Sequence, residues 1–339
     1  MDAADFDAFR KLGEKPKIPV CEGTYQENVN IPPGKRVHIQ GAGSGMTIVN
    51  RVPGTPGPVF FADNADKVNI SDLTVDGQGG GIGVYLNGAD GSTVEKIKVW
   101  DVDTGFRVEN IEGGEIKGNL VNGATSYGAE LVQSGDGVLQ GIDIMKNRFY
   151  DTGHDGAVVR GSNSDFITGI TFSNNWFEQT GACGISLFHG TGTTVKKNWF
   201  KDIGVHAMHV AGASFNTFVG NAAWDVGGNG ISMEMGTWNH FTKNTIRGVE
   251  ENGILAQDGW NYFTKNEITG SGMSGIKNEA TAEENTYEKN TVRGSGQFDA
   301  WDESADGGTA GTASVWTKNK CETDMPDGLC KSKAKPKKK

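Results

Sequence analysis

The side chains best suited to proton transfer gather in one short segment. Tyr150, Asp151, His154 and Asp155 lie within six residues, and Arg160 follows on the same segment. A histidine or carboxylate can remove a proton, a phenol or imidazole can return one, and a guanidinium can neutralise an acidic substituent. The segment therefore predicts a site that abstracts a proton next to a carboxylate, with these five residues as catalytic candidates.

The elements that must position these residues follow from a repeat. An asparagine recurs about every 25 residues, with an apolar residue three positions before it. The recurring positions are Asn119, Asn147, Asn175, Asn198, Asn221, Asn244, Asn266, Asn290 and Asn319. We interpret each interval as one coil of a solenoid, in which the apolar residues stack inside and the asparagines form a buried ladder.

A third element of each coil follows a glycine and alternates apolar and polar residues, as a half-buried strand requires. Examples are YGAELVQ, DGAVVRG, CGISLFHG and NGISMEMG. The chain has 51 glycines and only 9 prolines, which suits many short strands joined by tight turns. We therefore predict an all-β fold, a parallel β-helix of about 10–12 coils over residues 18–320.

This pattern resembles the right-handed parallel β-helix repeat superfamily, also called pectate-lyase-like. In addition, YDTGHDG is similar to the signature of alginate C5-epimerases and related lyases, a tyrosine followed by Asp-Pro-His-acid. Thr152 and Gly153 stand where that family has one proline. The resemblance implies a polysaccharide lyase or uronate C5-epimerase whose groove follows the strand after the glycine.

We expect the outward positions of those strands to line the groove. His189 would lie one coil above Arg160 and is a further catalytic candidate. We also place Met208 and Val210 outward and His209 inward. The predicted substrate-binding residues are Arg107, Glu130, Phe188, His206, Glu234, Asp258 and Lys277.

The two ends differ from the repeat. Residues 1–17 form a predicted cap with a short amphipathic helix between Asp5 and Leu12, and residues 321–339 form a loop and a basic tail. Cys321 and Cys330 could close that loop as a disulfide, which would imply an extracellular or periplasmic location. Cys21 and Cys183 are expected to be buried and inert.

Charge and motifs limit the partners. The formal charge is −10, and without the six lysines of the tail the chain holds 26 basic against 42 acidic residues. This acidity argues against nucleic acid as a partner. No segment is apolar and long enough for a membrane span, and no metal-ligand motif occurs. Binding of Ca²⁺ by outward-facing acidic residues stays open. We expect a monomer that binds a uronate-containing polysaccharide. The alternatives are a glycan-binding module, with Tyr85, Phe188, Trp238 and Trp260 stacking on sugars, and a structural surface β-helix.

Overall fold

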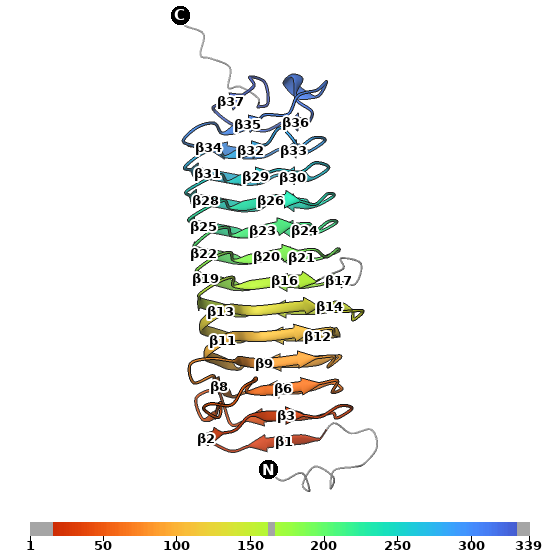
Figure 1. Cartoon of the computed structure of the whole chain (residues 1–339). Coiled ribbons are helices and arrows are strands. Elements are labelled where there is room, and N and C mark those ends of the chain that lie inside the picture. Colours follow the sequence, from red (N-terminus) through yellow and green to blue (C-terminus); the bar gives the residue numbers. More distant parts are fainter. Residues whose placement is uncertain (1–15, 162–166, 331–339) are drawn as a thin grey trace, which may run out of the picture.

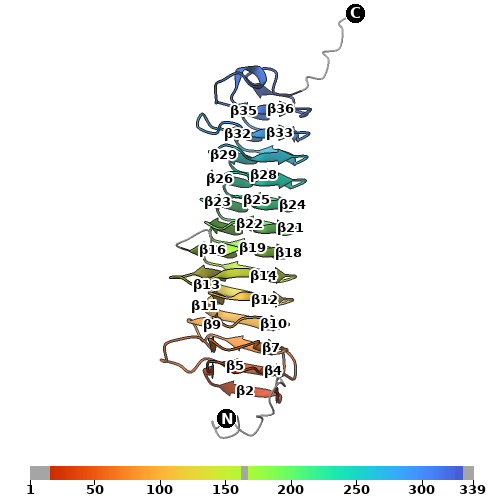
Figure 2. The same ribbon diagram turned by 90° about the vertical axis from the view of Figure 1, so that its right-hand side faces the viewer.

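Each coil of the chain contributes three short strands, and successive coils pair in parallel along one axis (Figures 1 and 2). The computed structural model describes residues 16–161 and 167–330. One sheet alone runs through 13 successive strands, so the predicted β-helix is confirmed with slightly more coils than expected. The asparagine repeat does not mark the early coils, because Leu73 and Ile97 occupy the ladder position there. The number predicted from the sequence was therefore too low.

Three sheets form the walls of the solenoid. We number them 1 to 3 in the order in which the chain passes through them within one coil, starting with the sheet that contains β1. Sheet 1 consists of β1 (Lys17–Val20), β4 (His38–Gly41), β7 (Asn69–Ser71), β10 (Ser92–Glu95), β12 (Glu112–Lys117), β14 (Leu139–Met145), β18 (Thr171–Ser173), β21 (Thr194–Lys196), β24 (Thr217–Val219), β27 (His240–Thr242), β30 (Tyr262–Thr264), β33 (Thr286–Glu288) and β36 (Val315–Thr317), with β17 (Ile167–Thr168) beside β14.

Sheet 2 follows the ladder corner. It consists of β2 (Gly23–Gln26), β5 (Thr47–Asn50), β8 (Thr74–Asp76), the first halves of β11 (Lys98–Glu109) and β13 (Leu120–Gln133), β15 (Arg148–Thr152), β19 (Trp176–Thr180), β22 (Trp199–Ile203), β25 (Ala222–Val226), β28 (Thr245–Val249), β31 (Glu267–Ser271) and β34 (Thr291–Arg293).

Sheet 3 completes each coil, and β11 and β13 join it to sheet 2 without a break. It consists of β3 (Val29–Ile31), β6 (Phe60–Asp63), β9 (Ile82–Asn87), the second halves of β11 and β13, β16 (Ala157–Gly161), β20 (Ile185–Phe188), β23 (Met208–Ala211), β26 (Ile231–Met235), β29 (Ile254–Ala256), β32 (Ile276–Asn278), β35 (Ala300–Asp302) and β37 (Asp324–Met325).

The recurring asparagines form the predicted ladder between sheets 1 and 2. Asn198 is typical: its Oδ1 accepts hydrogen bonds from the backbone N–H and the Nδ2 of Asn175, and its own Nδ2 donates to the Phe172 carbonyl. The residue before it, Lys197, has φ of 54°, and this sharp corner leaves backbone groups without a partner in the sheet. The ladder amides satisfy those groups in every coil from Asn119 to Asn319.

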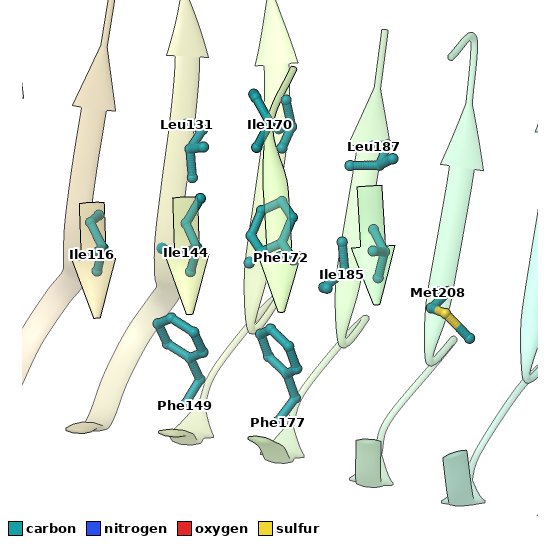
Figure 3. Packing of buried hydrophobic residues seen from close by; sticks show 14 of the residues in the cluster. Ile116, Leu131, Ile144, Phe149, Ile170, Phe172, Phe177, Ile185, Leu187 and Met208 are labelled. Carbon is teal, nitrogen blue, oxygen red and sulfur yellow. The ribbon is translucent and has the colours of Figure 1, made fainter. Parts of the chain in front are cut away.

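Stacked apolar side chains fill the interior. Phe149, Phe177 and Phe200 lie over one another with ring centroids 5.1 Å apart, and Figure 3 shows Ile116, Ile144 and Phe172 repeating on the facing sheet. A second ring column, Phe218, Phe241, Phe263, Tyr287 and Trp316, continues at spacings of 4.0 to 5.0 Å. Burial of these side chains supplies the main stabilising free energy of each coil.

The ends were predicted only in part. The expected amphipathic helix and the basic tail lie outside the described residues, and a 3₁₀ turn at Thr309–Gly311 is the one helical element within them. Cys321 and Cys330 form a disulfide. Cys183 is buried as expected, but Cys21 is exposed: it lies between β1 and β2 in the first coil, which has no coil below it in the described structure. The described residues include no helix long and apolar enough to cross a membrane.

Candidate active site

A polar column marks the corner between sheets 2 and 3. It occupies the position two residues before the first inward side chain of each sheet 3 strand. The column contains Tyr127, Asp155, Cys183, His206, Asn229, Asn252 and Ser274. Several members bond to the next coil: Asp155 Oδ1 accepts from the Cys183 N–H, and His206 Nδ1 accepts from the Asn229 N–H. The column is thus a second set of ladder positions, filled here by side chains that can also transfer protons.

Tyr127 stands at the centre of the candidate site. The His154 ring lies edge-on to it at 5.3 Å between centroids, and the Arg160 guanidinium carbon lies 5.5 Å from the ring centre. His154 Nδ1 is 3.3 Å from Asp155 Oδ1. The imidazole side chain is 58% exposed whereas the Asp155 side chain is buried. A buried carboxylate therefore orients an accessible imidazole beside a phenol and a guanidinium.

Arginines and carboxylates form a network next to this group. Arg160 pairs with Glu130, and Arg107 bridges Glu130 at 3.3 Å and Glu109 at 2.9 Å. Tyr85 donates a hydrogen bond of 2.6 Å to Glu109. Glu130 is almost fully buried, so its charge must be paired by the two guanidiniums. Sheet 3 thus brings Arg107, Glu130 and Arg160 together, as predicted for one face.

The same network shifts two pKa values. Burial raises the pKa of Tyr85 to about 12, with the Glu109 carboxylate adding to the effect. Burial alone would raise the pKa of Glu109, but hydrogen bonds from Ser134, Tyr85 and Arg107 outweigh it and lower that pKa. Glu109 and Glu130 together neutralise Arg107 and Arg160, and Arg160 is the more accessible guanidinium, with 43% of its side chain exposed.

Two neighbouring histidines, His206 and His209, lie further along sheet 3. The predicted orientation of His209 was wrong. His209 pairs in register with Ser186 and Ser232 and faces outward, whereas Met208 and Val210 are fully buried. The error arose because Ala207 replaces the glycine that marks the strand start in the neighbouring coils, at Gly184 and Gly230.

The outward His209 has three close neighbours. Its Nε2 lies 3.2 Å from Glu234 Oε1, and its ring contacts Phe188 edge-on at 5.4 Å and His206 at 5.6 Å. Burial, followed by the neighbouring His209, lowers the pKa of His206 to about 4. His206 is therefore neutral at physiological pH and serves the ladder.

Other predicted site residues lie apart from Tyr127. The expectation of a single turn carrying Tyr150 and Asp151 with His154 was wrong, because both residues belong to β15 on sheet 2. Tyr150 packs under the Arg148 guanidinium, at 5.3 Å from the ring centre. Asp151 is exposed with φ of 53° at a bend of that strand.

Three further residues occupy the loop edge or distant coils of sheet 3. His189 is exposed with φ of 70°, directly after β20. Asp258 accepts hydrogen bonds from the backbone of Gly236 and Gly259, which is a turn-stabilising role. Lys277 lies on β32, five strands beyond β16, with its Nζ 4.7 Å from the centre of the Trp301 ring.

Metal ligation has little support among the described residues. Within them, Cys321, Asp324 and Cys330 are the one group of three such side chains whose ligand atoms lie within 4.8 Å of one another. Both of its thiols are joined in the disulfide. We therefore assign no metal centre, and the suggested Ca²⁺ ligands gain no geometric support.

Comparisons with known proteins place the chain by fold. A family model described as "Right handed beta helix region" matches residues 58–223, and one described as "Periplasmic copper-binding protein (NosD)" matches residues 184–307. No curated protein sequence matches the chain. The right-handed β-helix prediction is thereby confirmed.

Solved structures similar to this chain include carbohydrate-active enzymes. The catalytic unit of a thermostable GH87 alpha-1,3-glucanase from Streptomyces thermodiastaticus matches with a TM-score of 0.68 at 16% identity, covering 92% of this chain and 64% of that one. The A-module of the mannuronan C-5 epimerase AlgE6 from Azotobacter vinelandii matches with a TM-score of 0.64 at 15% identity, covering 94% and 93%. At such identities the likeness concerns the fold alone, and the chain spans less than two thirds of the glucanase chain.

Proposed function

We propose that this right-handed parallel β-helix protein is a carbohydrate-active enzyme that abstracts the C5 proton of a uronate in an acidic polysaccharide. The observation that carries the proposal is that His154 and Arg160 both contact the Tyr127 ring, with Asp155 beside the imidazole. The two groups of neighbours noted above, an epimerase and glucanases, support a polysaccharide as substrate without specifying it. The uronate is inferred from Arg160, the more accessible of the two paired guanidiniums.

The roles follow from geometry. Asp155 fixes His154 with Nδ1 toward the carboxylate, which leaves Nε2 as the base that takes the C5 proton. Arg160 donates hydrogen bonds from its exposed guanidinium N–H groups to the uronate carboxylate while charge develops on it, and its bond to Glu130 holds the guanidinium in place. We assign the supply of a proton to the Tyr127 hydroxyl, because the ring contacts both His154 and Arg160. Delivered to the departing O4, it completes elimination with a new C4–C5 double bond; delivered to C5 from the opposite face, it completes epimerisation.

The test is turnover of alginate, pectate and glycosaminoglycans, with neutral alpha-1,3-glucan as a comparison. Ultraviolet absorbance of unsaturated ends reports elimination, and product NMR reports a changed uronate ratio. We expect activity on an acidic polymer and a loss of about 100-fold or more in His154→Ala and in Tyr127→Phe. Arg160→Lys should mainly raise KM, because a lysine keeps the charge but loses the fork geometry.

Matched controls distinguish this site from the sequence-based one. His38→Ala removes a histidine from the first coils and should leave turnover unchanged. Tyr150→Phe should change turnover by less than about tenfold, because Tyr150 lies on sheet 2. Full activity of His154→Ala, or wild-type activity confined to the neutral glucan, would refute the proposal.

An extracytoplasmic location fits the same function. The Cys321–Cys330 disulfide indicates an oxidising compartment, and the family model that matches residues 184–307 describes a periplasmic protein. Extracellular polysaccharides would be accessible to the protein there.

A further inference from the structure

A column of exposed aromatic rings lies outside the candidate active site, on the corner that leads into sheet 1. We name it the aromatic row; it consists of Phe215, Trp238 and Trp260. Each lies directly before one of three buried asparagines, Asn216, Asn239 and Asn261, which bond to one another and precede β24, β27 and β30. These strands are neighbours in Figure 1. The three side chains are 61%, 38% and 48% exposed. Tyr127 on β13 and Arg160 on β16 belong to earlier coils than the row, so the two features are separate.

The backbone at these positions makes the aromatic residues unexpected. Phe215, Trp238 and Trp260 have φ of 58°, 60° and 61°, in the left-handed region that bulky residues avoid. In the five preceding coils the same position holds glycine, at Gly91, Gly113, Gly141, Gly169 and Gly192. Lys67 and Glu284 occupy the same position in two further coils, with φ of 52° and 58°. The turn therefore requires only a left-handed backbone, yet three consecutive coils place a bulky aromatic residue there. Such strain with an exposed apolar side chain points to a binding role.

The rings do not bury one another as core rings do. Phe215 and Trp238 are nearly parallel with centroids 6.5 Å apart, and Trp238 and Trp260 are 5.4 Å apart. Within the core, stacked phenylalanines of sheet 1 are 4.6 to 4.9 Å apart. The row thus presents one loosely packed ring per coil in a line along the solenoid, which suits a linear polymer.

Charge and polarity select the kind of polymer. The row carries no charge, and the rest of the chain is strongly acidic, which disfavours nucleic acid and a second copy of the same protein. Polar groups border the row: the Tyr262 ring lies 6.2 Å from the Trp238 ring and stacks on the His240 ring at 4.6 Å. Pyranose units pair apolar C–H faces with outer hydroxyls, so both parts of this surface fit them.

We propose that the aromatic row is a polysaccharide-binding platform, on which successive hexopyranose units stack without help from charged groups. It binds independently of the catalytic roles assigned above. Binding should therefore tolerate high salt and neutral polymers, unlike recognition through Arg160.

The test measures binding of the full chain to insoluble glucans and to alginate by depletion and by affinity electrophoresis, at low and high salt. Trp238→Gly with Trp260→Gly should weaken binding about tenfold or more, and the thermal midpoint should be retained because glycine suits the left-handed backbone. Trp199→Ala is the matched control: Trp199 is 38% exposed on β22 and should leave binding unchanged.

Three outcomes would overturn the proposal. These are wild-type affinity in the double glycine variant, no binding of any polysaccharide by the wild type, and a wild-type dimer that dissociates in the variant in sedimentation velocity, which would identify a second copy as the occupant. His154→Ala should still bind, so a failed catalytic assignment does not affect this result.

Discussion

His206 illustrates how one side chain can serve the scaffold and still respond to pH. Its Nδ1 occupies the ladder position that Asn229 and Asn252 fill in the next two coils, and it accepts the Asn229 N–H. Burial is the main reason that its pKa falls to about 4; His209 adds to the effect and Glu234 opposes it. Between pH 6.5 and 4 the unfolded chain therefore binds a proton that the folded chain excludes.

We predict that His206 reduces the free energy of unfolding as the pH falls through this window. The loss should be on the order of 2 kcal/mol, below the full value of the shift because the ring is partly exposed. His206→Asn keeps a ladder acceptor and removes the titration, so its unfolding free energy should fall less than that of the wild type. Urea unfolding at both ends of the window checks this, with His240→Ala as a surface histidine control. Equal losses in wild type and His206→Asn would contradict it.

At the scale of the elements, each residue of the asparagine ladder should add to the stability that apolar burial gives its coil. Asn221 is buried, donates to the Val195 carbonyl and bonds to Asn198 and Asn244. Asn221→Ala would leave several buried backbone groups unsatisfied, so we expect a loss of about 2–4 kcal/mol in the free energy of unfolding. Denaturant unfolding measures it, and Asn30→Ala on the exposed side of β3 should change stability by less than about 0.5 kcal/mol.

The same elements show which parts of the structure the sequence could predict. The ladder asparagines and the apolar residues before them repeat at constant phase, so sheet 1 and the coil axis followed from the sequence. Strands of sheet 3 were phased from the preceding glycine, which works for Gly156 and Gly184. This phasing fails at Ala207, because alanine takes the position of the glycine but gives no turn signal. His209 was therefore predicted to face inward.

The site was harder to predict because it combines different coils. Tyr127 precedes Gly128 just as Asp155 precedes Gly156, and this shared phase was the available signal. Proximity in the sequence misled instead: Tyr150 and His154 are four residues apart, yet Tyr150 lies on the sheet 2 wall and His154 lies in the corner after β15. In a solenoid, residues one coil apart are closer neighbours than residues across a corner.

At the scale of the whole molecule, each coil contacts only the coils before and after it, so stability should vary along the axis. The C-terminal end has one covalent restraint, the Cys321–Cys330 disulfide, in the loop that follows the last sheet 1 strand. Closing a loop of this size contributes about 2–3 kcal/mol.

We predict that Cys321→Ser with Cys330→Ser loses amide hydrogen-exchange protection in β34 to β37 and leaves β9 to β26 unchanged. Asn221→Ala should show the opposite pattern, with loss centred on β22, β25 and β28. Exchange followed by mass spectrometry compares the two variants directly, because each acts as the other's control. Similar loss over all coils in both variants would instead show that the solenoid opens as one cooperative unit, in which a local restraint stabilises every coil equally.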